Sequence, residues 1–187
     1  MNNINISGAG KIDGGEYGTI KISGASKAQG DIKAESVRVS GSAKFTGTVQ
    51  ADEIRVSGSC HFDKSVKADQ MSISGSCRIN GEIEAEIIKI SGTVVVDADI
   101  NVDNFTVEIG RGSSFQNIFG DIVTIHSHVL VSAKEIEATT IDVDNLKAHR
   151  ISGEKVTVRG DSDIDIVEYR ESLEIEEGTK IRKVVKL

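Results

Sequence analysis

The sequence predicts an all-β protein that folds as a single-stranded β-helix, a β-solenoid with about 17 residues per coil. Two features of the composition favour strands. The 187 residues include 25 Ile and 19 Val but only 4 Leu, and β-branched side chains suit the pleated strand better than the helix. The chain also has no Pro, whose ring would remove one N–H from a strand ladder. The third observation is an internal repeat.

The repeat is marked by the dipeptide Ser-Gly, which recurs at a nearly constant interval and begins at Ser7, Ser23, Ser40, Ser57, Ser74 and Ser91. When the units are aligned on this dipeptide, apolar residues fall into columns. Neighbouring columns lie two residues apart, as residues do on one face of a strand. Two of these columns are Val39, Val56, Ile73 and Ile90, and Phe45, Phe62 and Ile79. One coil cannot bury these side chains alone, so we predict that stacked coils bury them as core ladders.

Glycines also recur in columns, which we assign to the corners of the coils. One column holds Gly41, Gly58, Gly75 and Gly92, and another holds Gly30, Gly47 and Gly81. Because Gly adopts positive φ without a steric penalty, we expect it to supply that conformation at a sharp corner.

The whole chain, residues 1–187, reads as one β-helix domain of ten or eleven coils. We expect regular coils over 4–107, irregular coils over 108–150, and regular coils again over 151–187. The frame loosens in the middle region, which indicates an insertion or a change of coil length. It returns near the end, where Val156 and Leu173 are separated by the same interval as equivalent residues of the earlier units.

Charged residues follow the columns as well. Lys21, Arg38, Arg55 and Lys89 form one outward column, and Glu35, Asp52, Asp69, Glu86 and Asp103 form another that comes three residues earlier. Like charges in one column repel, so we expect the opposite column to compensate in part, with each exposed pair worth at most about 1 kcal/mol. The formal net charge of −7 argues against a nucleic acid as partner.

Few residues offer chemistry. Cys60 and Cys77 share an inward column and are expected to be small core fillers. His126 and His128 are a candidate metal pair on one strand face, but no third ligand lies nearby in sequence. The acidic clusters at 97–99, 142–144 and 161–165 follow strand alternation and are expected to be solvated. We therefore expect no catalytic residues, no cofactor and no metal, and we expect that the protein is not an enzyme.

The repeat units resemble those of the bactofilins, which are bacterial polymer-forming cytoskeletal proteins. The resemblance is carried by Val37–Glu53, Ile54–Gln70 and Met71–Ile87, which share the pattern I-x-I-S-G-S-x-x-I-x-G-x-I-x-A-E. The opening Ile4–Gly8 and the tail Glu168–Ile175 are similar to the longer forms found in Bacillus-type bacteria.

The resemblance implies a right-handed β-helix that assembles end to end into non-polar filaments without nucleotide. Such filaments act as scaffolds for cell shape, envelope growth or motility organelles. The implied partners are the chain itself, a bactofilin paralogue, or a cell-envelope or flagellar protein. The opening residues contain no signal-peptide pattern and the chain contains no transmembrane run, so we expect a cytoplasmic location. Many family members have a long N-terminal tail with a membrane-targeting stretch; about three residues precede the first coil here, which leaves membrane contact open.

A solenoid has two open ends, and end-to-end assembly would use the apolar residues there. The residues predicted for this polymer interface are Ile4, Ile6, Ile12, Ile181, Val184, Val185 and Leu187. The basic residues Lys180, Arg182, Lys183 and Lys186 offer the alternative of a charged cap. Two other functions stay open: a β-helix enzyme of the acyltransferase type, which would need a catalytic His, and a solenoid module that binds a protein along one face.

Overall fold

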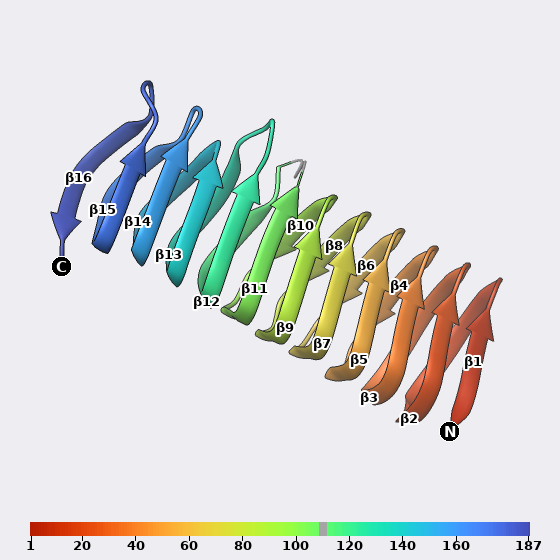
Figure 1. The fold of residues 1–187 in the computed structure, drawn as a ribbon. Helices are drawn as coiled ribbons and strands as arrows, with labels where there is room; N and C mark the ends of the chain where they lie inside the picture. Colours follow the sequence, from red (N-terminus) through yellow and green to blue (C-terminus); the bar gives the residue numbers. More distant parts are fainter. Residues whose placement is uncertain (109–111) are drawn as a thin grey trace.

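A computed structural model describes residues 1–108 and 112–187, and it confirms the all-β fold. The chain forms a parallel β-solenoid of about 11 coils with about 17 residues per coil. The described residues contain no helix, and all of their strands belong to one hydrogen-bonded sheet. Successive coils stack into a rod, with the two termini at opposite ends (Figure 1).

A strand continues through a corner where the backbone keeps strand geometry there, and it ends at a corner where the backbone does not. Their bounds are β1 (Asn2–Ile6), β2 (Ala9–Ile22), β3 (Ala25–Val39), β4 (Ser42–Phe45), β5 (Val49–Val56), β6 (Ser59–Phe62), β7 (Val66–Ile73), β8 (Ser76–Ile79), β9 (Ile83–Ile90), β10 (Thr93–Val96), β11 (Ile100–Glu108), β12 (Ser114–His126), β13 (Val131–Asp144), β14 (Leu146–Arg159), β15 (Asp163–Ile175) and β16 (Lys180–Lys186).

Each regular coil has three short segments, because the alternation of buried and exposed residues breaks at three places. In the coil that begins at Ile54, these are segment A (Ile54–Val56), segment B (Ser59–Phe62) and segment C (Val66–Ala68). The dipeptide Ser57-Gly58 separates segments A and B, and 63–65 separates segments B and C. The corner between segment C and the next segment A lies at Asp69-Gln70, where two consecutive side chains point outward. We call this last corner the C–A corner.

The core consists of equivalent residues that lie on top of one another. Val39 pairs with Val56, and Phe45 pairs with Phe62, in parallel register. The seven residues of the two columns named above are at most 3 % exposed. Phe45 and Phe62 stack with ring centroids 4.9 Å apart and planes 11° apart. Burial of such ladders is the main stabilising contribution, at roughly 25 cal/mol per Å² of apolar surface.

The glycines of the Ser-Gly corner have a different role from the one expected. Gly41, Gly58, Gly75 and Gly92 do not have positive φ, whereas Gly30 does, at 85°. A Cβ on Gly58 would lie 2.0 Å from the carbonyl oxygen of Gly41 in the coil beneath, and the other three glycines meet the same obstacle at the same distance. Close approach of one backbone to the next therefore excludes a side chain at this column.

Coil length changes between 108 and 150. Ile118 pairs with Ile136, which makes this coil one residue longer than the regular ones, whereas Val131 pairs with Leu146, which makes that interval two residues shorter. The longer coil includes a loop at 127–130 that leaves Val129 and Leu130 exposed. The next coil turns instead at Asn145, which adopts a φ of 50° and donates a side-chain hydrogen bond to the Ser127 carbonyl.

The expected compensation between the two charged columns is wrong. Arg38 and Arg55 both contact Glu53, at 3.1 Å and 2.5 Å, instead of the acidic column at the C–A corner. Partial burial opposes ionisation of Glu53, but the two hydrogen bonds from these arginines outweigh it and lower the pKa of its carboxyl group. Glu53 occupies the second position of the C–A corner, equivalent to Gln70, directly before segment A. It therefore lies closer to the arginines than the acidic column, which occupies the first position of that corner.

The glycine ladder yields a prediction for stability. We expect Gly58→Ala to destabilise the fold by about 2–4 kcal/mol, because the new methyl group would overlap a carbonyl oxygen that cannot move without its whole coil. The matched control is Gly8→Ala, whose Cβ would have no atom within 4 Å. Thermal unfolding followed by circular dichroism measures both. Equal midpoints for the two variants would show that the column does not require glycine.

Candidate functional site

The two ends of the rod are the places where strand edges lack a partner. Every internal strand of the solenoid pairs on both sides, whereas the outer edge of β1 and the outer edge of β16 pair with no strand in the described part of the chain. Unpaired parallel edges can accept another strand. The two ends are therefore the candidate functional site.

The N-terminal end is formed by β1 and the first part of β2. Ile4 and Ile6 pair with Ile20 and Ile22 and are half-buried. The side chain of Ile6 packs directly against Gly10. A Cβ on Gly10 would lie only 2.9 Å from the Cδ1 atom of Ile6. Ile12, which the sequence also placed in the interface, is 1 % exposed and so belongs to the core just behind the end.

The C-terminal end is more open. Val184 is 46 % exposed and Leu187 is 56 % exposed, while Ile181 and Val185 are half-buried. These four residues lie on β16 or directly after it, where they cover segments B and C of the coil that contains β15. Val184 pairs with the buried Val167, so it continues a core column that no further described coil covers. The strand β16 lies at the end of the rod (Figure 1).

Sequence reasoning missed two residues at this end, Leu173 and Ile175. They pair with Val156 and Val158 on segment A, and no further described coil covers them. Ile175 is 45 % exposed and Leu173 is half-buried. The repeat places both residues in core columns. Because no further coil covers the last residue of a core column, the sequence already indicated that these two side chains would be exposed at the end of the rod.

The basic residues near the C-terminal end do not all behave as a free charged cap. The Arg182 guanidinium contacts Asp163 at 2.8 Å and Asp165 at 2.5 Å and so ties the last coil to β15. The Nζ atom of Lys186 lies 5.8 Å from the ring centroid of Tyr169. The hydrogen bond between His149 and Asp165, with Arg182 beside it, lowers the pKa of the Asp165 carboxyl group.

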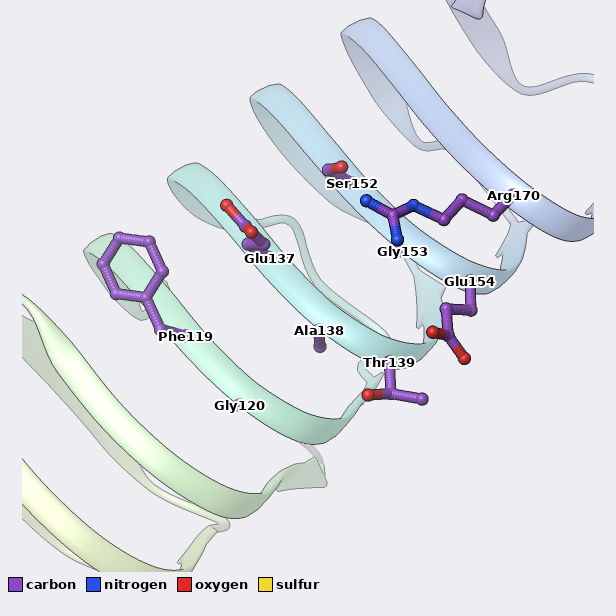
Figure 2. A pocket seen from close by; sticks show the side chains of 9 residues that line it. All are labelled: Phe119, Gly120, Glu137, Ala138, Thr139, Ser152, Gly153, Glu154 and Arg170. Atoms are coloured by element: carbon purple, nitrogen blue, oxygen red, sulfur yellow. The ribbon is translucent and has the colours of Figure 1, made fainter. Parts of the chain in front are cut away.

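A lateral groove crosses four coils near the C-terminal half of the rod (Figure 2). Its floor is formed by the small residues Gly120, Ala138 and Gly153, and the Arg170 side chain extends across it above Gly153. Phe119 stands exposed at the far side of the groove. Arg170 forms no ion pair with any residue that the structure describes. This groove is a candidate surface for binding a protein.

The residues considered for chemistry are dispersed. Cys60 and Cys77 are free, buried and adjacent in register, and burial raises the pKa of the Cys60 thiol. The Nε2 atom of His126 lies 3.4 Å from Asp142, whereas the exposed His128 lies beyond the end of β12, in the loop at 127–130. Within 1–108 and 112–187, no three His, Cys, Asp or Glu side chains come together as metal ligands.

Comparison with known proteins identifies the first half of the chain. A family model described as "Bactofilin: Polymer-forming cytoskeletal" matches residues 2–101. No curated protein and no solved structure matches the chain. In the described part of the chain, no helix has the length and apolar character needed to cross a membrane.

The ion pairs of Arg182 yield a prediction about pH. The pKa of Asp165 is lowered in the folded state, so this carboxylate stabilises the last coil above its ordinary pKa, near 3.8, and loses that effect as the pH falls through the lowered value. We expect Asp165→Asn and Arg182→Ala to reduce amide protection in β16 at pH 7. Hydrogen exchange of β16 measures this, and at a pH below the lowered pKa the wild type and Asp165→Asn should become alike.

The control for this prediction is Asp97→Asn, which removes an exposed ion pair with Arg78 far from β16. It should leave β16 protection unchanged. If the control variant loosened β16 as much as Arg182→Ala does, the ion pairs at the end would have no special role.

Proposed function

The chain belongs to the bactofilin family of polymer-forming cytoskeletal proteins, and from this premise we propose that it assembles end to end into filaments. The filaments are non-polar, they form without nucleotide, and they serve as a scaffold that organises cell shape or motility machinery. The observation that carries the proposal is that both ends of the rod leave a strand edge and apolar side chains uncovered.

The chemistry of the ends supports stacking. A further coil placed on β16 would pair its backbone groups and cover Val184, Leu187 and Ile175, which are all at least 45 % exposed. The burial of each large apolar side chain contributes about 1.5–3 kcal/mol when it is complete. At the other end, a second strand on β1 would cover Ile4 and Ile6 in the same way.

A non-polar filament requires two different contacts. The N-terminal end of one copy meets the N-terminal end of a second, and the C-terminal end meets the C-terminal end of a third. Each contact is then isologous, because the same residues meet across a two-fold axis. A polar filament would instead use a single contact between unlike ends.

A structural role is favoured over catalysis. The family is cytoskeletal, and the groove of Figure 2 contains no His for an acyltransferase reaction. The groove favours one secondary candidate, a surface along which a partner protein binds the scaffold. We propose a paralogue, a cell-envelope protein or a flagellar protein as that partner, and the cytoplasm as the location.

The assembly proposal predicts different products from blocking one end or both ends. Ile4→Asp with Ile6→Asp should stop growth at the N-terminal end, and Val184→Asp with Leu187→Asp should stop growth at the C-terminal end. In a non-polar assembly, either pair of substitutions leaves the other contact intact, so the product should be a dimer. All four together should give monomers. Sedimentation measures the size, and negative-stain electron microscopy without nucleotide detects filaments.

A matched control is Val129→Asp with Leu130→Asp, which alters two exposed apolar residues on the side of the rod. This variant should form filaments of wild-type length. Wild-type filaments from the four-residue variant would contradict stacking through the ends, and monomers from either two-residue variant would contradict the non-polar arrangement.

A further inference from the structure

A column of basic side chains, four of them Lys or Arg and one His, runs along segment B of the first five coils. It consists of Lys11, Lys27, Lys44, His61 and Arg78, each paired in register with the next. Successive members lie one coil apart, about 4.8 Å along the rod. Lys11 and Lys27 form no ion pair with a described residue. Lys44 and His61 contact Asp63 at 3.1 Å and 2.8 Å, and Arg78 contacts Asp97 at 2.8 Å. We call this column the cationic ladder.

The cationic ladder borders a shallow groove. The floor of the groove is formed by the small buried residues Ala43, Cys60 and Cys77, and its other side is a row of hydroxyl groups on Ser42, Ser59, Ser76 and Thr93. Small side chains next to long cations leave the charged groups accessible to a ridge on another molecule. The face therefore suits a partner that presents anions at the same spacing.

The C–A corner carries such a row of anions. Six acidic residues occupy equivalent positions on six successive coils. The residues before and after each one are paired in register with those of the next coil. The six are Glu35, Asp52, Asp69, Glu86, Asp103 and Asp121. The side chains of all six are exposed. None of the six carboxylates forms an ion pair or a hydrogen bond with a residue that the structure describes. We call this column the acidic ladder.

The acidic ladder is unfavourable within one molecule. Two unit charges about 4.8 Å apart in water repel by roughly 0.9 kcal/mol before screening by salt. The arginines that were expected to offset this repulsion contact Glu53 instead. A row of cations with the same spacing would convert the repulsion into attraction.

The two ladders lie on opposite sides of the rod. In a coil with three segments and three corners, the corner between segments C and A is opposite segment B. Each acidic residue also follows a cation by eight residues, as Glu35 follows Lys27 and Asp52 follows Lys44, so the two lie at nearly the same height. Moving one copy sideways, with no rotation, brings its acidic ladder against the cationic ladder of the next copy.

We propose that the cationic ladder of one copy binds the acidic ladder of a second copy, so that parallel rods associate side by side. Three matched levels then pair a Lys or Arg with a carboxylate: Lys27 with Glu35, Lys44 with Asp52, and Arg78 with Glu86. At the level between the last two, the imidazole of His61 faces Asp69. The contact joins two unlike surfaces and relates the copies by translation, so it does not close and produces a flat sheet of rods. The present ion pairs of Lys44 and Arg78 are exposed and weak, and they leave both cations able to bridge to a second carboxylate.

The test is a charge swap between two variants. The first carries Lys27→Glu, Lys44→Glu and Arg78→Glu, and the second carries Asp52→Lys, Asp69→Lys and Glu86→Lys. Each variant alone should lose side-by-side association, because both of its ladders then carry the same sign. An equal mixture should regain it, since each altered ladder meets a complementary one. Electron microscopy gives the width of the assemblies, and circular dichroism verifies that each variant is folded.

The matched control is Lys21→Glu with Lys33→Glu and Lys89→Glu, which changes net charge by the same amount outside the cationic ladder. It should keep the wild-type width. In the wild type, raising NaCl from about 0.1 M to about 1 M should separate the rods, because the screening length falls from about 10 Å to about 3 Å. Retained width in both single variants, or failure of the mixture of folded variants to regain width, would overturn the proposal.

The proposal rests on end-to-end assembly only for the length of the rods. If end stacking failed, single copies would still associate side by side and respond to the charge swap. If the ladders failed, long filaments would remain single in all variants. Length therefore reports on the ends, and width reports on the ladders. The alternative is that the cationic ladder binds an acidic protein and not a second copy. In that case the second variant would not restore the width of assemblies of the first variant. That outcome would also overturn the proposal.

Discussion

Parallel stacking in register is the constraint on which the rest of this molecule depends. Each residue lies about 4.8 Å above its equivalent in the previous coil, so every column repeats one chemical environment along the rod. In the core this places Phe45 on Phe62 and Val39 on Val56. At the Ser-Gly corner it brings each glycine against the carbonyl oxygen of the glycine beneath, at a distance that no Cβ could occupy. A single geometric rule thus determines both the hydrophobic ladders and the glycine ladder.

The same rule accounts for the surfaces. Stacking satisfies the backbone of every internal coil, so unpaired edges remain only in the first and last coils among the described strands. It also repeats charged side chains, which produces rows of like charge that a globular fold would disperse. The ends offer hydrogen bonds and apolar burial, whereas the sides offer charge at a regular spacing. These are different kinds of contact, so salt should affect them differently, and a scaffold can use the first to grow in length and the second to grow in width.

The departures from regularity have local causes. Where the chain changes from a longer coil to a shorter one, the core columns stay in register because the difference is absorbed in the loop at 127–130 and at the turn formed by Asn145. The buried side chains of Val131 and Leu146 still lie on one another. Burial of the core therefore decides the register, and the corners adapt to it.

Over residues 4–107, the sequence by itself determined which residues stack, because a nearly constant period and strand alternation leave only one consistent alignment of the apolar columns. It indicated the fold, the core ladders and the inward position of Cys60 and Cys77. It did not reveal why glycine occupies the Ser-Gly corner, which carboxylate contacts Arg38 and Arg55, or that Leu173 and Ile175 lie uncovered at the end. It also did not reveal that the acidic and cationic ladders face in opposite directions. Those features depend on the angles between segments and on the distance from one backbone to the next, and a repeat records only the order of residues along the chain.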